Sequence, residues 1–307
     1  MVKRILCVLI GTIAFSLAAF AQTESQHLEF EGFDAVVIED EFDVTFRESR
    51  NYMVDYTVDA ALENNRLVEI YARGNTLYIS LNRKGMSSDL KKQYRGRNAG
   101  KAVLKAVIYA PSISSLTVRG KAVFDAAGTE FIGKSMALTV SDNAKVSGIT
   151  INTEELTVDL SKAAEAVVKA DVEDIIVRNS GTAILTLNYF ASKADITAGG
   201  SSKTSASGDV KSVSVHAKGN PDISLSGKGD LLKVEGSGTT DFDGVNYTVR
   251  EAITDMSGSS KAYVSASEKL SLNLRGGHVV FSGEPVINIL SIKSASVTRL
   301  SDEKVRR

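Results

Sequence analysis

The sequence predicts an all-β protein: a right-handed parallel β-helix (β-solenoid) of about ten rungs, roughly 19 residues each, with an N-terminal β-rich capping region. Three observations predict it. Corner-like residue pairs recur at a nearly fixed period. Apolar and polar residues alternate around each corner with the period of 2 that a strand requires. The chain is rich in Gly, Ser, Thr and Val and has only three Pro residues, which favours short strands over helices.

Small or polar residue pairs mark the corners of the predicted rungs. Counting the second residue of each pair, successive corners are separated by 22, 20, 19, 19, 19, 19, 20 and 19 residues. Corner glycines can adopt a positive φ that other residues resist, so the loop EGSGTTDFDG at positions 235–244 is interpreted as a corner. The corners are Arg119-Gly120, Ser141-Asp142, Ser161-Lys162, Ser180-Gly181, Gly199-Gly200, Lys218-Gly219, Ser237-Gly238, Ser257-Gly258 and Gly276-Gly277, with a last turn near Ser294-Ala295.

The alternation also predicts the core. Apolar residues recur four positions before the corners, among them Val215 and Val234. A second set recurs four positions after the corners and includes Ile223 and Phe242. We call each set a row. Residues two apart on a strand share a face, so we expect both rows to point inward. Uneven rung lengths without strict hexapeptides favour right-handed winding. The repetitive solenoid is expected over residues 111–301.

The first 21 residues have the form of a secretory signal peptide. Lys3 and Arg4 precede the apolar run Ile5–Phe20, and Ala19-Phe20-Ala21 is a small-x-small cleavage site. The single cysteine, Cys7, lies in the segment predicted to be removed, so we expect a mature chain without disulfides or a thiol nucleophile. No second apolar stretch is long enough to span a membrane as a helix. We therefore expect export to the periplasm or the cell surface, with no transmembrane segment in the mature chain.

Residues 28–110 are predicted to form the capping region, because a solenoid exposes strand edges at its ends that must be covered. Alternating stretches such as Ala35–Phe46 and Tyr52–Val58 each read as one strand, and Asp59–Asn65 reads as one helical turn. Residues 82–101 interrupt the alternation, so we expect a long loop there. Loops of this length are usually functional or disordered.

Residues 82–101, called the basic segment below, carry seven cations and one acid. Such an excess of positive charge suits an anionic surface polysaccharide or another envelope protein as ligand. The simpler interpretation is a solvated hairpin. The candidate ligand-binding residues are Arg83, Lys84, Lys91, Lys92, Arg95, Arg97 and Lys101.

One column of charged side chains provides a candidate catalytic pair. Lys203, Asp222, Asp241 and Lys261 each lie three residues after a corner and are expected to stack on the outer face. Two carboxylates one strand spacing apart could act as acid and nucleophile or hold a cation, as carboxylate pairs do in glycosidases. The alternative is a charge-balanced exposed ladder.

Other motifs lack the context that their chemistry needs. Residues 128–135 satisfy the phosphate-loop pattern GxxxxGK[ST], but that loop must open a helix, whereas Met136–Ser141 alternates like a strand. Residues 236–242 contain one partial copy of a calcium nonapeptide that works only in stacks. The three histidines show no zinc spacing. With an export signal as well, we expect no cofactor, no metal, no nucleotide and no nucleic acid.

Several soft patterns together resemble a known family. The chain resembles the bacterial putative auto-transporter adhesins with a head GIN domain, which come mostly from Bacteroidetes envelopes. The resemblance rests on Phe33-Asp34-Ala35-Val36, Phe42-Asp43-Val44, the bridge APSISSLTVRG and the serial Ser-Gly corners. The resemblance covers residues 33–298, nearly the whole mature chain. It implies export by a Gram-negative bacterium and a β-helical fold, and it brings no catalytic residues. The chain departs from the family pattern at Ser141-Asp142, Ser161-Lys162 and Asn220-Pro221.

Two classes of function are compatible with these features. The first is an exported, non-enzymatic β-helical scaffold for adhesion or for binding glycans or proteins, because the long faces of a solenoid suit extended ligands. The second is a polysaccharide-active β-helix enzyme, a hydrolase or lyase, that uses the stacked pair Asp222 and Asp241.

Overall fold

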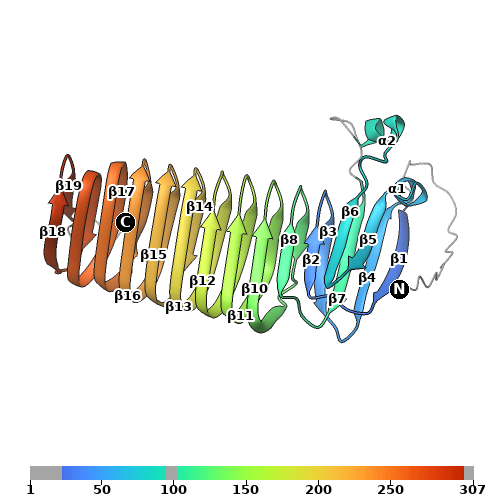
Figure 1. The fold of residues 1–307 in the computed structure, drawn as a ribbon, viewed down its shortest axis with the longest axis horizontal. Coiled ribbons are helices and arrows are strands. Elements are labelled where there is room, and N and C mark those ends of the chain that lie inside the picture. The colour runs from blue at the N-terminus through green and yellow to red at the C-terminus, as the bar shows by residue number, and fades with distance from the viewer. Residues whose placement is uncertain (1–22, 95–101, 301–307) are drawn as a thin grey trace, which may run out of the picture.

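The protein is an elongated solenoid of β-strands with a capped N-terminal end (Figure 1). Its structure, a computed structural model, describes residues 23–94 and 102–300; the predicted signal peptide lies outside them. The strands are β1 (Thr23–Phe30), β2 (Ala35–Ile38), β3 (Asp43–Glu48), β4 (Tyr52–Asp59), β5 (Val68–Arg73), β6 (Thr76–Leu81), β7 (Leu104–Ala110), β8 (Ser115–Val118), β9 (Val123–Asp125), β10 (Glu130–Val140), β11 (Lys145–Leu160), β12 (Glu165–Asn179), β13 (Ile184–Gly200), β14 (Lys203–Ser207), β15 (Val210–Gly219), β16 (Asp222–Gly238), β17 (Asp241–Ser282), β18 (Val286–Ile292) and β19 (Ser296–Arg299); the helices are α1 (Ala60–Asn64) and α2 (Ser88–Gln93).

Successive rungs pair in parallel, and the predicted inward rows form the core. Val215 of β15 lies beside Val234 of β16, and Ile223 of β16 lies beside Phe242 of β17. All four side chains are fully buried. The all-β solenoid of about ten turns is therefore confirmed, and its right-handed winding stays a prediction. Such stacking buries a continuous apolar column that no single rung could bury alone.

The predicted corners lie along one edge of the solenoid, the upper edge in Figure 1. Gly238 has a φ of 89°, and a Cβ added there would lie 2.6 Å from the carbonyl oxygen of Gly219 in the preceding rung. Two neighbouring corners have Asp142 and Lys162 in place of glycine, with φ values of 67° and 63°. Their side chains form an ion pair, and the Asp142 carboxylate also accepts a hydrogen bond from the Gly120 N–H at 3.3 Å. Lys162 and Gly120 lower the pKa of Asp142, so it stays ionised.

The stretch Ala35–Phe46 was predicted as one strand, and that prediction is wrong. The chain turns at Asp40, whose φ is 67°, and the two halves β2 and β3 stack in parallel on β8 and β9. This stretch is therefore the first rung of the solenoid. Asp tolerates the left-handed conformation better than most residues, and here its carboxylate accepts a hydrogen bond from the Leu81 N–H at 2.8 Å.

Antiparallel strands cover the N-terminal end. β1 pairs with β4, β4 with β7, and β5 with β6, while β6 and β7 stack in parallel on the first rung. Helix α1 confirms the predicted helical turn. No helix of the described residues is long and apolar enough to cross a membrane.

Candidate functional site

The predicted carboxylate pair lies in an exposed column of side chains on neighbouring rungs. Asp222 lies between Lys203 and Asp241 in the strand register, and all three side chains are exposed. No ion pair joins either aspartate to another described residue. Neither lines the two grooves described below. The structure thus brings the predicted residues together, but on an open surface where water screens their charges.

The basic segment was predicted to be a long loop, but part of it is helical. It joins β6 to β7 where the other rungs have a corner, and it contains helix α2, whose N-terminus is capped by Ser87 accepting from the Leu90 N–H at 3.3 Å. Met86 is buried in the core, and Leu90 and Tyr94 pack against it. Burial, together with Asp59, raises the pKa of Tyr94 to about 12. An apolar anchor therefore holds the start of the segment against the cap.

The cations of the basic segment differ in their surroundings. Arg83 forms ion pairs with Asp40 and Glu41, and Lys92 lies 3.7 Å from Asp89. Lys84 and Lys91 are exposed. Arg95, Arg97 and Lys101 lie outside the described residues.

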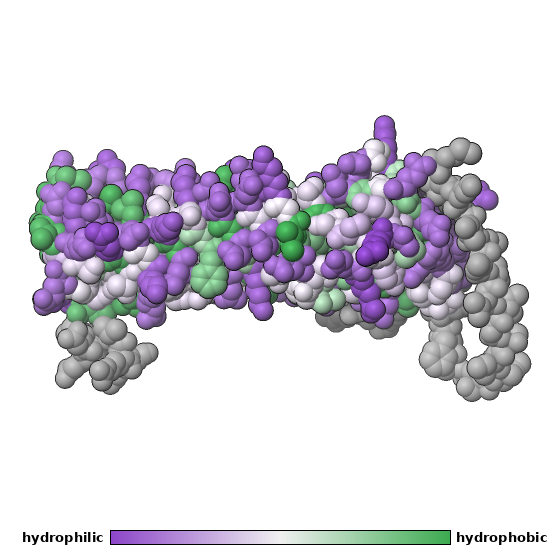
Figure 2. Space-filling view, turned by 90° about the horizontal axis from the view of Figure 1, so that it is seen from below, coloured by the Kyte–Doolittle hydropathy of each residue, from purple (hydrophilic) through white to green (hydrophobic). Residues whose placement is uncertain are grey.

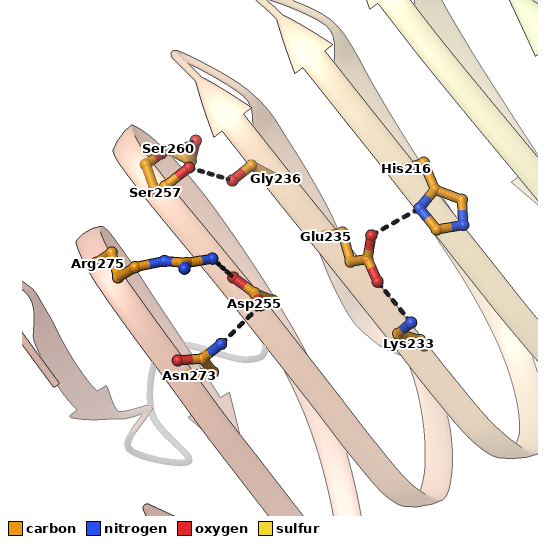
Figure 3. Close-up of polar contacts among 9 residues, drawn as sticks. All are labelled: His216, Lys233, Glu235, Gly236, Asp255, Ser257, Ser260, Asn273 and Arg275. Carbon is orange, nitrogen blue, oxygen red and sulfur yellow. Dashed lines mark hydrogen bonds and ion pairs between the residues drawn. The ribbon is translucent and has the colours of Figure 1, made fainter. Parts of the chain in front are cut away.

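A first groove lies beside the corners, along the strand segments that lead into them, and is called the corner groove. It was not predicted. Its cavity has a volume of about 550 Å³. Small residues such as Gly199, Ser237 and Ser257 leave this space open beside a column of charged side chains. Figure 3 shows that column: His216 contacts Glu235 at 2.9 Å. The other contacts are Lys233 to Glu235 at 2.5 Å, Asn273 to Asp255 at 2.7 Å and Arg275 to Asp255 at 3.2 Å.

The charges of the corner groove satisfy one another. Glu235 and Asp255 are neighbours in the strand register, and each has its own basic or amide partner. Lys233, followed by His216, lowers the pKa of Glu235, and Glu235 raises the pKa of Lys233. A general acid needs a carboxyl group whose pKa is raised. Glu235 is arranged in the opposite sense, because its basic partners favour the ionised carboxylate.

A second groove, the Phe190 groove, lies on the opposite edge of the solenoid, where each rung makes its second bend; Figure 2 views the molecule from that side. Its cavity has a volume of about 460 Å³. Phe190 of β13 is 60% exposed in it, beside the exposed side chains of Asp171 and Asn188. The Asn152 amide donates to Glu130 at 3.3 Å. The lining is Glu130, Thr150, Ile151, Asn152, Lys169, Ala170, Asp171, Asn188, Tyr189, Phe190, Ser207 and Gly208.

The backbones of two neighbouring rungs lie in close contact at the Phe190 groove. Gly208 has no side chain, and a Cβ added there would lie 1.6 Å from the carbonyl oxygen of Tyr189. The sequence contained a signal for Phe190 itself: the inward residues Leu185, Leu187 and Tyr189 alternate, which places Phe190 outside. The groove could not be predicted from the sequence of one strand, because neighbouring rungs supply the rest of its lining.

Other motifs have structural roles. The phosphate-loop pattern at residues 128–135 runs into strand β10, so it opens no helix, as predicted. The glycine-rich stretch at positions 235–244 forms the corner at Gly238. Among the described residues, no group of three or more His, Cys, Asp or Glu side chains could hold a metal ion.

Comparisons with known proteins agree with the fold. The profile of the family described as "Putative auto-transporter adhesin, head GIN domain" matches residues 32–209 and 189–285. No curated protein matches the chain. The solenoid is similar to crystal structures of a putative adhesin from Parabacteroides merdae (14% identity, 91% of this chain and 97% of that chain, TM-score 0.51) and one from Parabacteroides distasonis (14%, 91% and 98%, TM-score 0.52). Since the family profile covers well over half of the sequence, the chain belongs to the family of putative auto-transporter adhesins with a head GIN domain.

Proposed function

We propose that the protein is an exported, non-enzymatic scaffold of the cell envelope that binds glycan chains, and that adhesion follows from this binding. The observation that carries the proposal is the Phe190 groove. An exposed aromatic ring offers a flat apolar face, and a sugar ring offers a matching face of C–H groups. The amides of Asn152 and Asn188 and the carboxylate of Asp171 can bind sugar hydroxyls around that face.

The position of the groove also suits a polymer. Its lining comes from β10, β11, β12, β13 and β14, so it crosses several rungs along the solenoid axis. A chain lying in it would meet a new rung at intervals of roughly 4.8 Å. Repeated weak contacts of this kind add up along an extended ligand, as they do on other solenoid surfaces.

The competing proposal is a polysaccharide-active enzyme, and the register of Asp222 and Asp241 is the observation that favours it. The exposure of both side chains argues against it. Glycosidases place their two carboxyl groups in a site that raises the pKa of the acid. Glu235 in the corner groove is not such an acid either, since its pKa is lowered.

One experiment distinguishes binder from enzyme. Purified protein is applied to a glycan array, and every glycan that binds is then incubated with the protein and assayed for new reducing ends and for unsaturated lyase products. We expect binding without cleavage. If no glycan binds, the proposal is wrong. If a glycan is cleaved and Asp222→Asn abolishes the cleavage, the enzyme interpretation replaces it.

We further propose that the basic segment adds electrostatic contacts to anionic envelope polymers. Lys84, Lys91 and Lys92 are exposed on or beside helix α2, at the corner edge near the cap, so they can reach a polymer that lies outside the grooves. Exposed charges are screened beyond roughly 8 Å at physiological salt. Useful binding therefore requires several simultaneous contacts.

This proposal predicts that binding to alginate, a polyanionic glycan, falls steeply with salt. Changing Lys91, Lys92, Arg95 and Arg97 to Ser together should weaken alginate binding about tenfold or more at low salt, because each lost contact contributes up to about 1 kcal/mol. Alginate pull-down at two salt concentrations measures it.

A matched control removes four exposed cations from the solenoid instead: Lys134, Lys203, Lys211 and Lys261 to Ser. It changes the net charge by the same amount and should retain binding. Equal, salt-insensitive binding by the wild type and both variants would contradict the proposal and favour the interpretation of the basic segment as a solvated hairpin.

A further inference from the structure

At the C-terminal end of the described residues, the apolar column of the solenoid ends in exposed side chains. Leu270, Leu272 and Leu274 of β17 are fully buried, and they lie beside three isoleucines of the last rung. Those isoleucines continue the same inward column, and among the described residues no strand pairs with β18 on its outer side. Ile287, Ile289 and Ile292 are 42%, 59% and 40% exposed. Figure 2 shows hydrophobic residues gathered at the end formed by β18 and β19.

Strand β18 forms an apolar edge, and its only irregularity against β17 is a register shift at Leu290. Its sequence, VINILSI, contains no charged residue, and Val286 and Leu290 add two more exposed apolar side chains at 74% and 65%. Among the described residues it pairs only with β17, so one row of backbone N–H and C=O groups has no strand partner. Native proteins protect such edges with charges, proline, bulges or a covering element.

The N-terminal end is built differently. Its outer strands β1 and β5 carry charged residues, among them Glu24, Glu29, Glu69 and Arg73, and helix α1 lies beside β1 and β4. That end therefore has edge charges and a neighbouring helix, neither of which the described residues provide at β18. Stacking of one copy's C-terminal end on another copy's N-terminal end would place apolar side chains of β18 against these charges, which costs desolvation energy.

We infer that the C-terminal end is the interface of a tail-to-tail homodimer, in which β18 of one copy pairs antiparallel with β18 of a second copy. The uncharged edge matches itself, so two identical copies can meet without repulsion between like charges. A two-fold arrangement uses the same patch on both subunits and closes, which avoids open filaments. The pairing would satisfy the free backbone groups and cover the exposed aliphatic side chains. The sequence that follows β19, LSDEKVRR, carries five charges, and burial of those charges against an apolar row would cost desolvation energy.

The first test is the mass of the protein in solution. The mature chain, from Gln22 onward, is analysed by size-exclusion chromatography with light scattering at micromolar concentration. We expect twice the monomer mass. The double variant Ile289→Lys, Leu290→Lys should give the monomer mass, because it buries two like charges against their copies. Ile132→Lys on β10 is the control, since Ile132 is 66% exposed but lies far from β18, and it should remain dimeric.

The second test reports the geometry without a disruptive charge. Ile289→Cys in the mature chain is the only cysteine present. In an antiparallel pair centred on residue 289, the two Cα atoms lie about 4.5–5.5 Å apart, within the range that a disulfide bridges. We expect mild oxidation to give a covalent dimer from Ile289→Cys and none from Ile132→Cys. A monomeric wild type, a dimer that survives both lysines, a larger polymer, or no cross-link at residue 289 would each overturn the proposal.

Discussion

Phe242→Ala lowers the free energy of unfolding by about 3–5 kcal/mol, the usual loss for truncating a large core side chain. Phe242 is fully buried and lies beside Ile223 of the preceding rung. The ring fills its space tightly: a Cβ added to Gly244 would lie 2.8 Å from one of its ring carbons. Neighbouring rungs cannot collapse into the cavity without giving up their own backbone ladder. Chemical denaturation followed by circular dichroism measures the loss.

A second phenylalanine in the same chain is the control for this prediction. Phe190 is exposed in its groove, so Phe190→Ala should change the free energy of unfolding by no more than about 0.5 kcal/mol, as most surface substitutions do. Equal losses for Phe242→Ala and Phe190→Ala would mean that the inward and outward rows are wrongly assigned.

Gly238→Val destabilises the protein by more than about 2 kcal/mol. The φ of 89° at this corner is strained for any L-residue and more so for a β-branched one. A Cβ would also meet the backbone oxygen of Gly219 at 2.6 Å, and backbone cannot move aside as a flexible side chain can. Two rungs would therefore have to separate locally. The shift in denaturation midpoint measures the effect.

Gly133→Val is the matched control. Gly133 lies in strand β10, has nothing within 4 Å of an added Cβ and does not have a positive φ. Valine favours strands, so this variant should be as stable as the wild type or slightly more stable. If Gly238→Val is tolerated equally well, the tight corner does not lie at Gly238.

The repetitive part of the fold could be predicted because its two signals are local and repeat. Gly219 and Gly238 recur at the rung period, and Val215 and Val234 keep the same distance from them. One rung was missed for a physical reason. The corner at Asp40 is not a glycine and lies 80 residues before the next corner, Gly120, so no period reveals it.

The candidate sites were harder to predict than the fold. Asp222 and Asp241 share a column, as the spacing predicts, but the open groove with an aromatic ring lies at Phe190 on another edge. Helix α2 is a single capped turn and a half within a polar stretch, too short for a helical period to show. The depth of a groove depends on how side chains of successive rungs pack against one another. The spacing of residues along one strand does not determine that packing.

The most direct test of glycan binding is the contribution of the Phe190 ring. The glycan bound most tightly on the array is titrated into the wild type, Phe190→Ala, Phe190→Tyr and Ile184→Ala. Ile184 lies on the same strand and is 44% exposed, outside the groove. We predict binding at least about tenfold weaker for Phe190→Ala, a loss of about 1.4 kcal/mol, with near-normal binding by Phe190→Tyr and Ile184→Ala. Unchanged affinity in Phe190→Ala would contradict the account.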